Sequence, residues 1–233
     1  MNMICFDLEG VLVPEIWIAF SEVSGIPELR RTTRDEPDYT KLMNWRMGIL
    51  REHGLGLKEI QDTIAKIDPL PGAKEFLDEL RSTQQAVIIS DTFSQFAGPL
   101  MKKLGWPTLF CNELTVGEDG MIDGFRLRIK NTKLSTVRAF QSIGYETVAI
   151  GDSFNDLDML LASKKGILFR TTEEIKKKHP ELPCCDSYND LGMIQASKAG
   201  FLFKSTEQIK RDHPELPAFE EYDELFDAIM SVL

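Results

Sequence analysis

The sequence predicts an α/β fold: a Rossmann-like parallel sheet flanked by helices, with a small helical cap inserted after the first strand. Short apolar runs alternate with helical patterns along most of the chain, which is typical of a parallel sheet covered on both faces. Several of these runs end in a carboxylate or a hydroxyl residue. Residues 14–71 are helical in pattern throughout, so we expect them to form the cap, with 1–13 and 72–233 as the core.

The elements are expected in the following order. The apolar residues 3–6 form a buried strand that runs into Asp7 and a turn at Gly10. The cap then carries three apolar stripes of helical spacing, and the first two end at Gly25 and Gly54. Further strands of the core are expected at residues 86–90, 108–111, 147–150 and 166–169. Helices are expected around residues 76–80, 96–104 and 132–143, and a hairpin at 113–129 around Asp119-Gly120.

Three polar side chains stand at the ends of predicted strands. Asp7 follows the first strand, Ser90 ends the second, and Asp152 follows the strand at 147–150. In open parallel sheets, ligands bind outside the carboxyl ends of the strands, where these ends meet at one edge. The fold prediction alone therefore brings Asp7, Ser90 and Asp152 to one site.

Composition excludes several classes of function. The chain has 233 residues and a formal net charge of −10, which argues against nucleic acid or an anionic membrane as a partner. Its four cysteines show no C-x-x-C pairing and are too few for a disulfide scaffold. The N-terminus lacks a basic region before its first acidic residue, and no apolar run approaches membrane-spanning length. These observations predict a cytoplasmic protein.

Four short motifs occur in a fixed order, each at a predicted strand end or helix start. They are Asp7-Leu-Glu-Gly-Val11, Ser90-Asp-Thr92, Lys133 and Gly151-Asp-Ser-Phe-Asn-Asp156. Each alone is weak evidence, but together they resemble the motifs of the haloacid dehalogenase-like phosphatase superfamily. Residues 7–17, with 33–35 and 37–39, resemble more closely its bifunctional phosphoserine phosphatase/homoserine phosphotransferase branch. A dehalogenase activity is disfavoured, because the acidic motif typical of Mg²⁺-dependent members is present.

Phosphoryl transfer needs positioning and charge neutralisation, and a carboxylate nucleophile divides it into formation and breakdown of an acyl phosphate. Asp7 is placed for that role on a rigid strand end. Mg²⁺ prefers hard oxygen ligands, which Asp7, Asp152 and, by the resemblance, the backbone carbonyl of Glu9 would supply. Glu9 is the natural general acid, although many superfamily members have Asp at this position.

The remaining predicted site residues bind substrate. Lys133 and Ser90 would hold the phosphoryl oxygens and compensate their charge. The resemblance also implies Asp91, Thr92 and Asn155 as substrate-binding residues. In the cap, Arg46 interrupts an apolar helical stripe, and it is either a clamp for a substrate carboxylate or a structural arginine that snorkels or pairs with an acid. Glu15 could pair with a substrate ammonium, and the resemblance adds Met43 as a pocket residue.

The last third of the chain contains a tandem duplication. Residues 152–183 recur as 186–217, with 21 of 32 positions identical. Asp152 follows an apolar strand and a turn glycine, whereas Asp186 follows a proline-containing segment and Cys185, so we expect Asp152 to be the metal ligand. The second copy either adds a unit at the sheet edge or competes with the first for one sheet position, and the losing copy would then be extruded, disordered or swapped into a neighbouring molecule. We expect the first copy to occupy the sheet and the second to be the appended part. The oligomeric state is not predicted.

The leading hypothesis is a Mg²⁺-dependent phosphoserine phosphatase that acts through an aspartyl phosphate and can also transfer the phosphoryl group to homoserine. One alternative is a phosphatase for another small phosphomonoester, because the core motifs do not specify the substrate. Another is a non-catalytic module on the same fold. Intact Asp7, Ser90, Lys133 and Asp152 argue against that last alternative, since a module without catalysis has no chemical need for all four.

Overall fold

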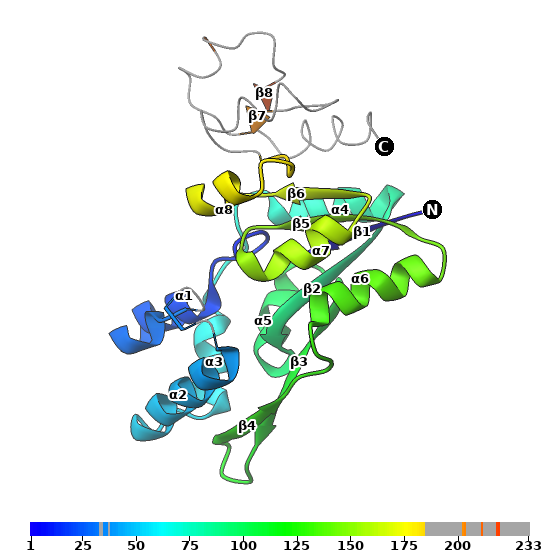
Figure 1. The fold of residues 1–233 in the computed structure, drawn as a ribbon. Coiled ribbons are helices and arrows are strands. Elements are labelled where there is room, and N and C mark those ends of the chain that lie inside the picture. Colours follow the sequence, from blue (N-terminus) through cyan, green and yellow to red (C-terminus); the bar gives the residue numbers. More distant parts are fainter. Residues whose placement is uncertain (33–34, 37, 185–201, 204–210, 212–217, 220–233) are drawn as a thin grey trace.

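A computed structural model describes residues 1–32, 35–36, 38–184, 202–203, 211 and 218–219. Its main sheet has six strands in the order β4-β3-β2-β1-β5-β6 (Figure 1). The strands are β1 (Asn2–Phe6), β2 (Gln85–Phe93), β3 (Thr108–Val116), β4 (Ile122–Arg126), β5 (Glu146–Gly151) and β6 (Lys165–Leu168). All pairs are parallel except β3 with β4, which form the hairpin expected around Asp119-Gly120. The predicted α/β fold is confirmed.

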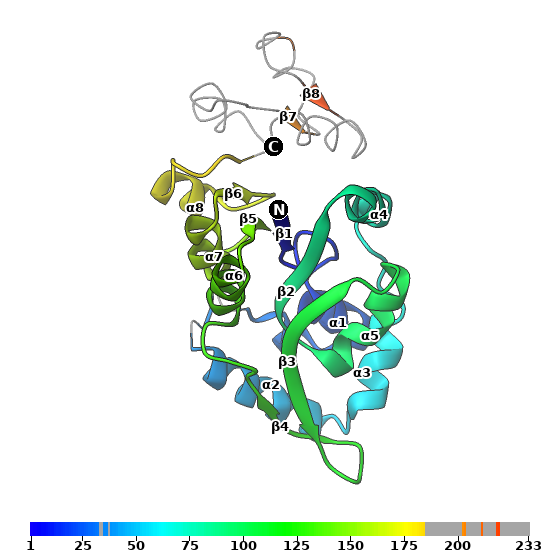
Figure 2. The ribbon, with the colours of Figure 1, turned by 90° about the vertical axis from the view of Figure 1, so that its right-hand side faces the viewer.

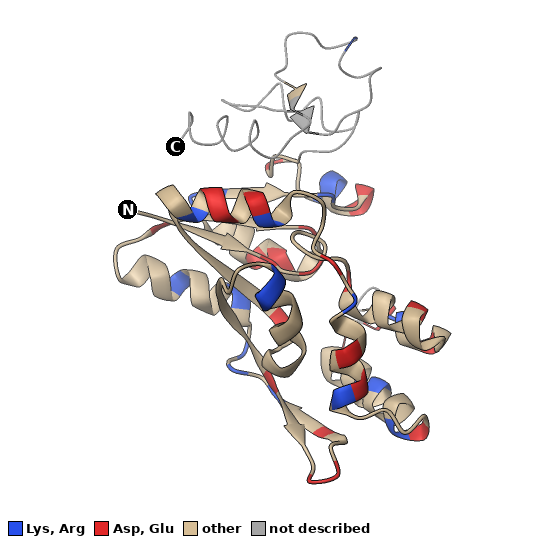
Figure 3. Cartoon of the chain, turned by 180° about the vertical axis from the view of Figure 1, so that it is seen from behind, with Lys and Arg blue, Asp and Glu red and all other residues tan. Residues whose placement is uncertain are grey.

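Helices cover both faces of the sheet, with α6 and α7 on one side and α4 and α5 on the other (Figure 2). Their bounds are α4 (Ala73–Thr83), α5 (Ser94–Lys103), α6 (Thr132–Ser142) and α7 (Leu157–Ala162). Successive strand residues alternate between the two cores: Ile4 and Phe6 pack with the α4 and α5 side, and Met3 and Cys5 with the α6 and α7 side. Charged residues gather on helices and loops (Figure 3).

The described residues between 14 and 71 contain no strand. They form α1 (Ile16–Ser24), the short 3₁₀ helix η1 (Pro27–Arg30), α2 (Tyr39–Glu52) and α3 (Leu57–Ile64). Gly25 lies just after α1 with φ +71°, and Gly54 lies after α2 with φ +64°, which explains why both glycines ended their stripes. We retain residues 14–71 as the cap, and 1–13 with 72–233 as the core, as a proposed division.

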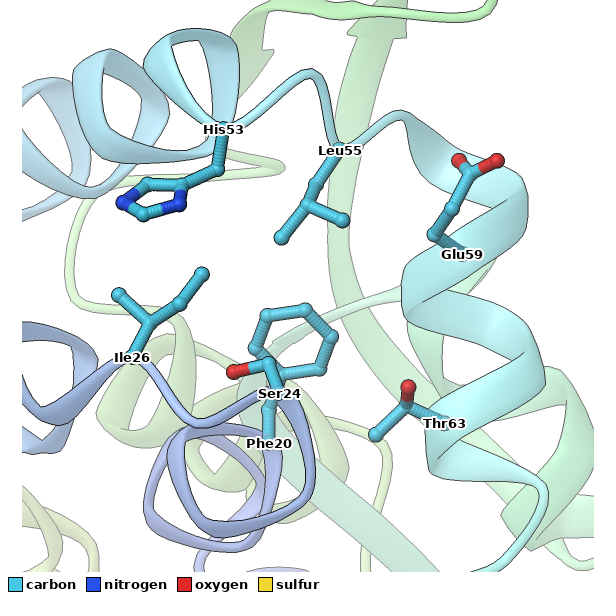
Figure 4. A pocket seen from close by; sticks show the side chains of 7 residues that line it. All are labelled: Phe20, Ser24, Ile26, His53, Leu55, Glu59 and Thr63. Atoms are coloured by element: carbon cyan, nitrogen blue, oxygen red, sulfur yellow. The ribbon is translucent and has the colours of Figure 1, made fainter.

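The cap helices border a partly open pocket of about 220 Å³ (Figure 4). Its lining residues come from α1 and the segment just after it, from the segment between α2 and α3, and from α3. They are Phe20, Ser24, Ile26, His53, Leu55, Glu59 and Thr63. None of them is a predicted site residue, so this pocket is distinct from the predicted site.

The repeat contributes to two sheets. Lys165–Leu168 of the first copy is β6, which pairs with β5 in the main sheet, and α8 (Glu173–Lys178) follows it. Leu202–Phe203 of the second copy is β7, which pairs with β8 (Ala218–Phe219) in a separate two-stranded sheet. Asp186 lies outside the described residues. In the described part of the chain, no helix is long and apolar enough to span a membrane.

Candidate active site

The strand ends converge as the sheet order requires. β1 lies between β2 and β5, so successive strands are added on one side of β1 up to β4 and on its other side from β5 onward. Ligand sites in such folds form at the strand ends beside this reversal of strand order. The backbone N–H of Asp7 donates to the carbonyl of Ile150 at 2.9 Å, which aligns the ends of β1 and β5. Asp7, Asp152 and Asp156 are buried, and one carboxylate oxygen from each lies within 4.8 Å of the others. The predicted Asp7 and Asp152 are therefore brought together.

Lys133, in the first turn of α6, contacts this acidic cluster. Its buried Nζ lies 3.0 Å from Asp7 Oδ2 and 2.5 Å from Asp156 Oδ1. Asp91 Oδ2 is also near, at 3.9 Å. Burial alone would lower the pKa of Lys133, but Asp156 and Asp7 outweigh it and hold this pKa well above its ordinary value. The lysine is therefore a permanent positive charge beside Asp7.

Asp156 was part of a quoted motif but was given no role from the sequence. In the structure it organises the turn after β5: Oδ2 accepts the backbone N–H groups of Asp152 and Ser153, both at 3.0 Å. Its other oxygen, Oδ1, accepts from Lys133. The available signal was an aspartate four residues after Asp152, but an acid at a helix start is common as a cap, so the pattern did not distinguish these functions.

Two glycines allow the acidic residues to approach the backbone. Gly10 has φ +76°, and a Cβ added to it would lie 2.5 Å from Asp152 Oδ2. A Cβ on Gly151 would lie 2.5 Å from Asp156 Cβ. Any larger residue at position 10 or 151 would therefore clash with Asp152 or Asp156, because real Cβ contacts are essentially never this short. The structure thus gives a steric reason for Gly151, the turn glycine whose presence before Asp152 favoured this residue over Asp186 as the metal ligand.

The cluster is rich in carboxylates. Three buried carboxylates face one ammonium, and burial, followed by Asp156 and Asp152, raises the pKa of Asp7 well above its usual range despite the opposing effect of Lys133. A divalent cation with a preference for hard oxygen ligands fits this donor set. Asp156 already accepts from Lys133 and two backbone amides, so Asp7 and Asp152 are the better candidate ligands.

Glu9 connects the loop after β1 to the proposed cap. Its Oε2 accepts the backbone N–H of Ile16, the first residue of α1, at 2.8 Å. Burial, and next the charge of Glu15, raise the pKa of Glu9 to about 7, while the Ile16 N–H lowers it. A carboxyl group with this pKa can both give and take a proton near neutral pH.

Arg46 is buried in the cap, so the snorkelling alternative is wrong: its charged group does not reach solvent. The guanidinium lies over the Trp17 ring, 4.3 Å from its centroid, and Nη2 donates to the Arg31 carbonyl at 2.7 Å. Nη1 lies 3.7 Å from the sulfur of Met43, which is also buried. No carboxylate of the described residues lies within 4.0 Å of Arg46, and its Nε is buried without a hydrogen-bond partner.

The second strand end holds the remaining predicted residues. Ser90 and Thr92 are buried, and Ser90 Oγ accepts the Thr92 N–H at 3.2 Å. Asp91 is half-buried, and its Oδ2 accepts from Asn155 Nδ2 at 2.8 Å. Glu15 lies at the start of α1, and its charge acts on both Glu9 and Arg46. The structure thus brings the core residues together, with Glu9, Glu15, Met43 and Arg46 grouped on the cap side.

Three contacts in this region were not foreseen. The Asp91 carbonyl accepts from Tyr39 Oη of α2 at 2.9 Å and from Asn112 Nδ2 of β3 at 3.1 Å. Trp17 is buried, and its ring also stacks on Arg46. These pairs are far apart in sequence, so hydrophobic periodicity carries no signal of them.

Comparison with known proteins agrees with this geometry. The chain is 51% identical over 183 residues to the phosphoserine phosphatase ThrH of Pseudomonas aeruginosa, covering 78% of this chain and 89% of that protein. It is 50% identical over 183 residues to a phosphoserine phosphatase of Pseudomonas syringae pv. tomato, covering 78% and 77%. A solved phospho-aspartyl intermediate analogue of phosphoserine phosphatase shares the fold, with a TM-score of 0.66 at 22% identity and coverage of 83% and 97%. Residues 1–164 match the haloacid dehalogenase-like hydrolase model, so the chain belongs to this family of enzymes, as its motifs predicted.

Proposed function

We propose that this enzyme is a Mg²⁺-dependent phosphoserine phosphatase that forms an aspartyl phosphate on Asp7. The observation that carries the proposal is a pair of complementary binding features. A buried lysine stands beside Asp7 in the core, and a buried arginine with an unpaired Nε stands in the cap. The first suits a phosphate and the second suits a carboxylate, and phosphoserine has both groups.

In the first step, an Asp7 oxygen attacks phosphorus and the bond from phosphorus to the serine oxygen breaks. Protonated Glu9 gives its proton to that leaving oxygen, which releases serine. In the second step, Glu9 takes a proton from water while the water oxygen attacks phosphorus, and the Asp7 carboxylate is regenerated with release of phosphate. A pKa of about 7 for Glu9 suits both proton transfers.

Lys133 and Ser90 are the groups that would hold the phosphoryl oxygens. Mg²⁺, when bound, neutralises the repulsion between the phosphoryl group and the acidic cluster. We propose Asp7, Asp152 and the Glu9 carbonyl as its protein ligands. The burial of Asp7 and Asp152 next to each other supports this assignment, because adjacent carboxylate oxygens are the hard ligands that Mg²⁺ prefers.

Recognition of the amino-acid part is proposed for the cap. Burial lowers the pKa of Arg46 to about 10, with Glu9, Tyr39 and Glu15 opposing this change, so it stays charged at neutral pH. A buried cation with an unpaired N–H is costly, and a substrate carboxylate would satisfy it. Glu15 would bind the ammonium group and Met43 would line the pocket. The two phosphoserine phosphatases at 51% and 50% identity support the same substrate class.

We further propose that homoserine can replace water as the acceptor, so that its hydroxyl oxygen attacks the phosphoryl group on Asp7. Support for this comes from the resemblance of residues 7–17, 33–35 and 37–39 to the bifunctional branch. A cytoplasmic location and a small phosphorylated amino acid as the partner complete the proposal.

The test measures phosphate release from phosphoserine with Mg²⁺ and again with EDTA, and then with homoserine present. We expect activity only with Mg²⁺, and phosphohomoserine when homoserine is added. Arg46→Lys should raise KM for phosphoserine at least tenfold, because lysine keeps the charge but cannot form the paired N–H contacts of guanidinium. Arg51→Lys is the matched control, since Arg51 lies on the same helix in an exposed ion pair with Asp123. Indifference to phosphoserine, with activity on other phosphomonoesters, would transfer the proposal to another substrate.

A further inference from the structure

Tyr39 links the two ends of the proposed site. It is the first residue of α2, and its hydroxyl donates to the backbone carbonyl of Asp91 across the boundary between cap and core, at 2.9 Å. Its ring packs edge-to-face on Phe125 of β4, with 5.9 Å between centroids. Burial, and next Asp91, raise the pKa of Tyr39, so the hydroxyl stays a proton donor at neutral pH.

The face of α2 that begins at Tyr39 carries the proposed carboxylate site. Tyr39, Met43 and Arg46 are spaced by four and three residues, so they share one face of the helix. The acceptor of the Tyr39 hydroxyl lies in the segment proposed to hold the phosphate, between Ser90 and Thr92. One hydrogen bond therefore joins the helix that carries Arg46 to the strand end that carries Ser90.

The core side of this link is held firmly. The same Asp91 carbonyl accepts from Asn112 Nδ2, and Asn112 Oδ1 accepts the backbone N–H of Arg128. The Asp91 side chain is bound by Asn155. Strand β2 near Asp91 is thus fixed from β3 and from the turn after β5, so the hydroxyl of Tyr39 positions the cap against a rigid reference.

We propose that Tyr39 is a positioning residue for substrate selection: its hydroxyl fixes the distance between Arg46 in the cap and the phosphate-binding end of β2. This inference rests on the proposed phosphoserine phosphatase function. Only substrates that contact both ends depend on that distance. A phosphate ester without a carboxylate, such as p-nitrophenyl phosphate, uses the core end alone.

The test is Tyr39→Phe, which removes the hydroxyl and keeps the ring on Phe125. We expect the ratio of kcat/KM for phosphoserine to that for p-nitrophenyl phosphate to fall about tenfold, mainly through a higher KM for phosphoserine, as expected for one lost hydrogen bond. In an Arg46→Lys background, Tyr39→Phe should change the ratio no further, because both substitutions act through the same contact. Tyr145→Phe is the matched control: its hydroxyl donates to Gln85 Oε1, and the ratio should stay as in the wild type.

The outcomes separate the two claims. If the wild type shows no preference for phosphoserine over p-nitrophenyl phosphate, the proposed function fails, and the inference fails with it. If the wild type shows this preference and Tyr39→Phe keeps the ratio, only the inference is overturned. Equal losses on both substrates, or additivity with Arg46→Lys, would also overturn it, because they indicate a general structural effect.

Discussion

Lys133→Met tests whether one buried lysine holds the acidic cluster together. Methionine is similar in length, so the substitution removes the charge with little change in packing. In the part of the chain that the structure describes, Lys133 is the one cation within 4.0 Å of Asp7, Asp91 or Asp156. Removing it leaves buried carboxylates without their counter-ion.

The magnitude follows from the burial of the partners. The side chains of Lys133, Asp7 and Asp156 are 2%, 7% and 0% exposed, so solvent screens these contacts little. Breaking a buried ion pair by removing one partner costs about 3 to 5 kcal/mol. We expect a loss of that order in the free energy of unfolding at pH 8, measured by urea denaturation in the presence of EDTA.

The loss should depend on pH in a definite direction. The pKa of Asp7 is already raised above its unfolded value, so the folded state holds this proton more tightly and loses stability as pH rises toward the folded pKa. Lys133 lowers that pKa, so its removal raises the pKa further and extends this window upward. The deficit of Lys133→Met relative to the wild type should therefore shrink as pH falls from 8 to 5.

A surface lysine provides the matched control. Lys103 pairs with Asp68 at 2.7 Å, but the side chains are 30% and 84% exposed, so Lys103→Met should leave the denaturation midpoint nearly unchanged. A deficit for Lys133→Met as small as that of Lys103→Met, or one independent of pH, would refute the electrostatic account of the cluster.

Three further predictions concern the same site. Gly10→Ala should abolish Mg²⁺-dependent phosphate release and lower the thermal unfolding midpoint, because φ at this position is +76° and the new Cβ would lie 2.5 Å from Asp152 Oδ2. A variant as active as the wild type would contradict the proposed position of Asp152. Glu9→Gln should reduce phosphoserine hydrolysis at least a hundredfold but hydrolysis of p-nitrophenyl phosphate much less, since nitrophenolate leaves without a proton, and equal losses on both substrates would argue against an acid role. In the wild type, kcat/KM for phosphoserine should fall above about pH 7, where Glu9 loses its proton. Asp152→Asn should abolish Mg²⁺-dependent activity and Asp186→Asn should preserve it, and the reverse pattern would assign the site to the second repeat copy.

The fold was predictable because its signals are local. Each buried parallel strand is a short apolar run, and each cap helix has an apolar stripe, the first two of which end at Gly25 and Gly54. The exact strand lengths were less accessible: residues 108–111 and the start of the hairpin form one continuous strand, Thr108–Val116, because pairing with both β2 and β4 extends it. Pairing with neighbours is a tertiary effect that a single segment does not encode.

The site was predictable only where strand ends imply proximity. Asp7, Ser90 and Asp152 follow apolar runs, and the order of parallel strands brings such ends to one edge. Asp156 was not assigned a role, because its function depends on Lys133, 23 residues earlier in the chain. The contact of Tyr39 with Asp91 spans 52 residues and joins cap to core, so no periodicity marks it.

Charge supports the proposal that the buried cluster and the buried cap arginine belong to one site. The core end has three carboxylates against one lysine, and the cap end has a guanidinium with an unpaired Nε. A phosphorylated amino acid with its metal ion would complement both ends, because it would bring a cation to the core and a carboxylate to the cap. Ligand binding should therefore stabilise the fold, and phosphoserine together with Mg²⁺ should raise the thermal midpoint of Asp7→Asn, which cannot turn the substrate over, more than either does alone.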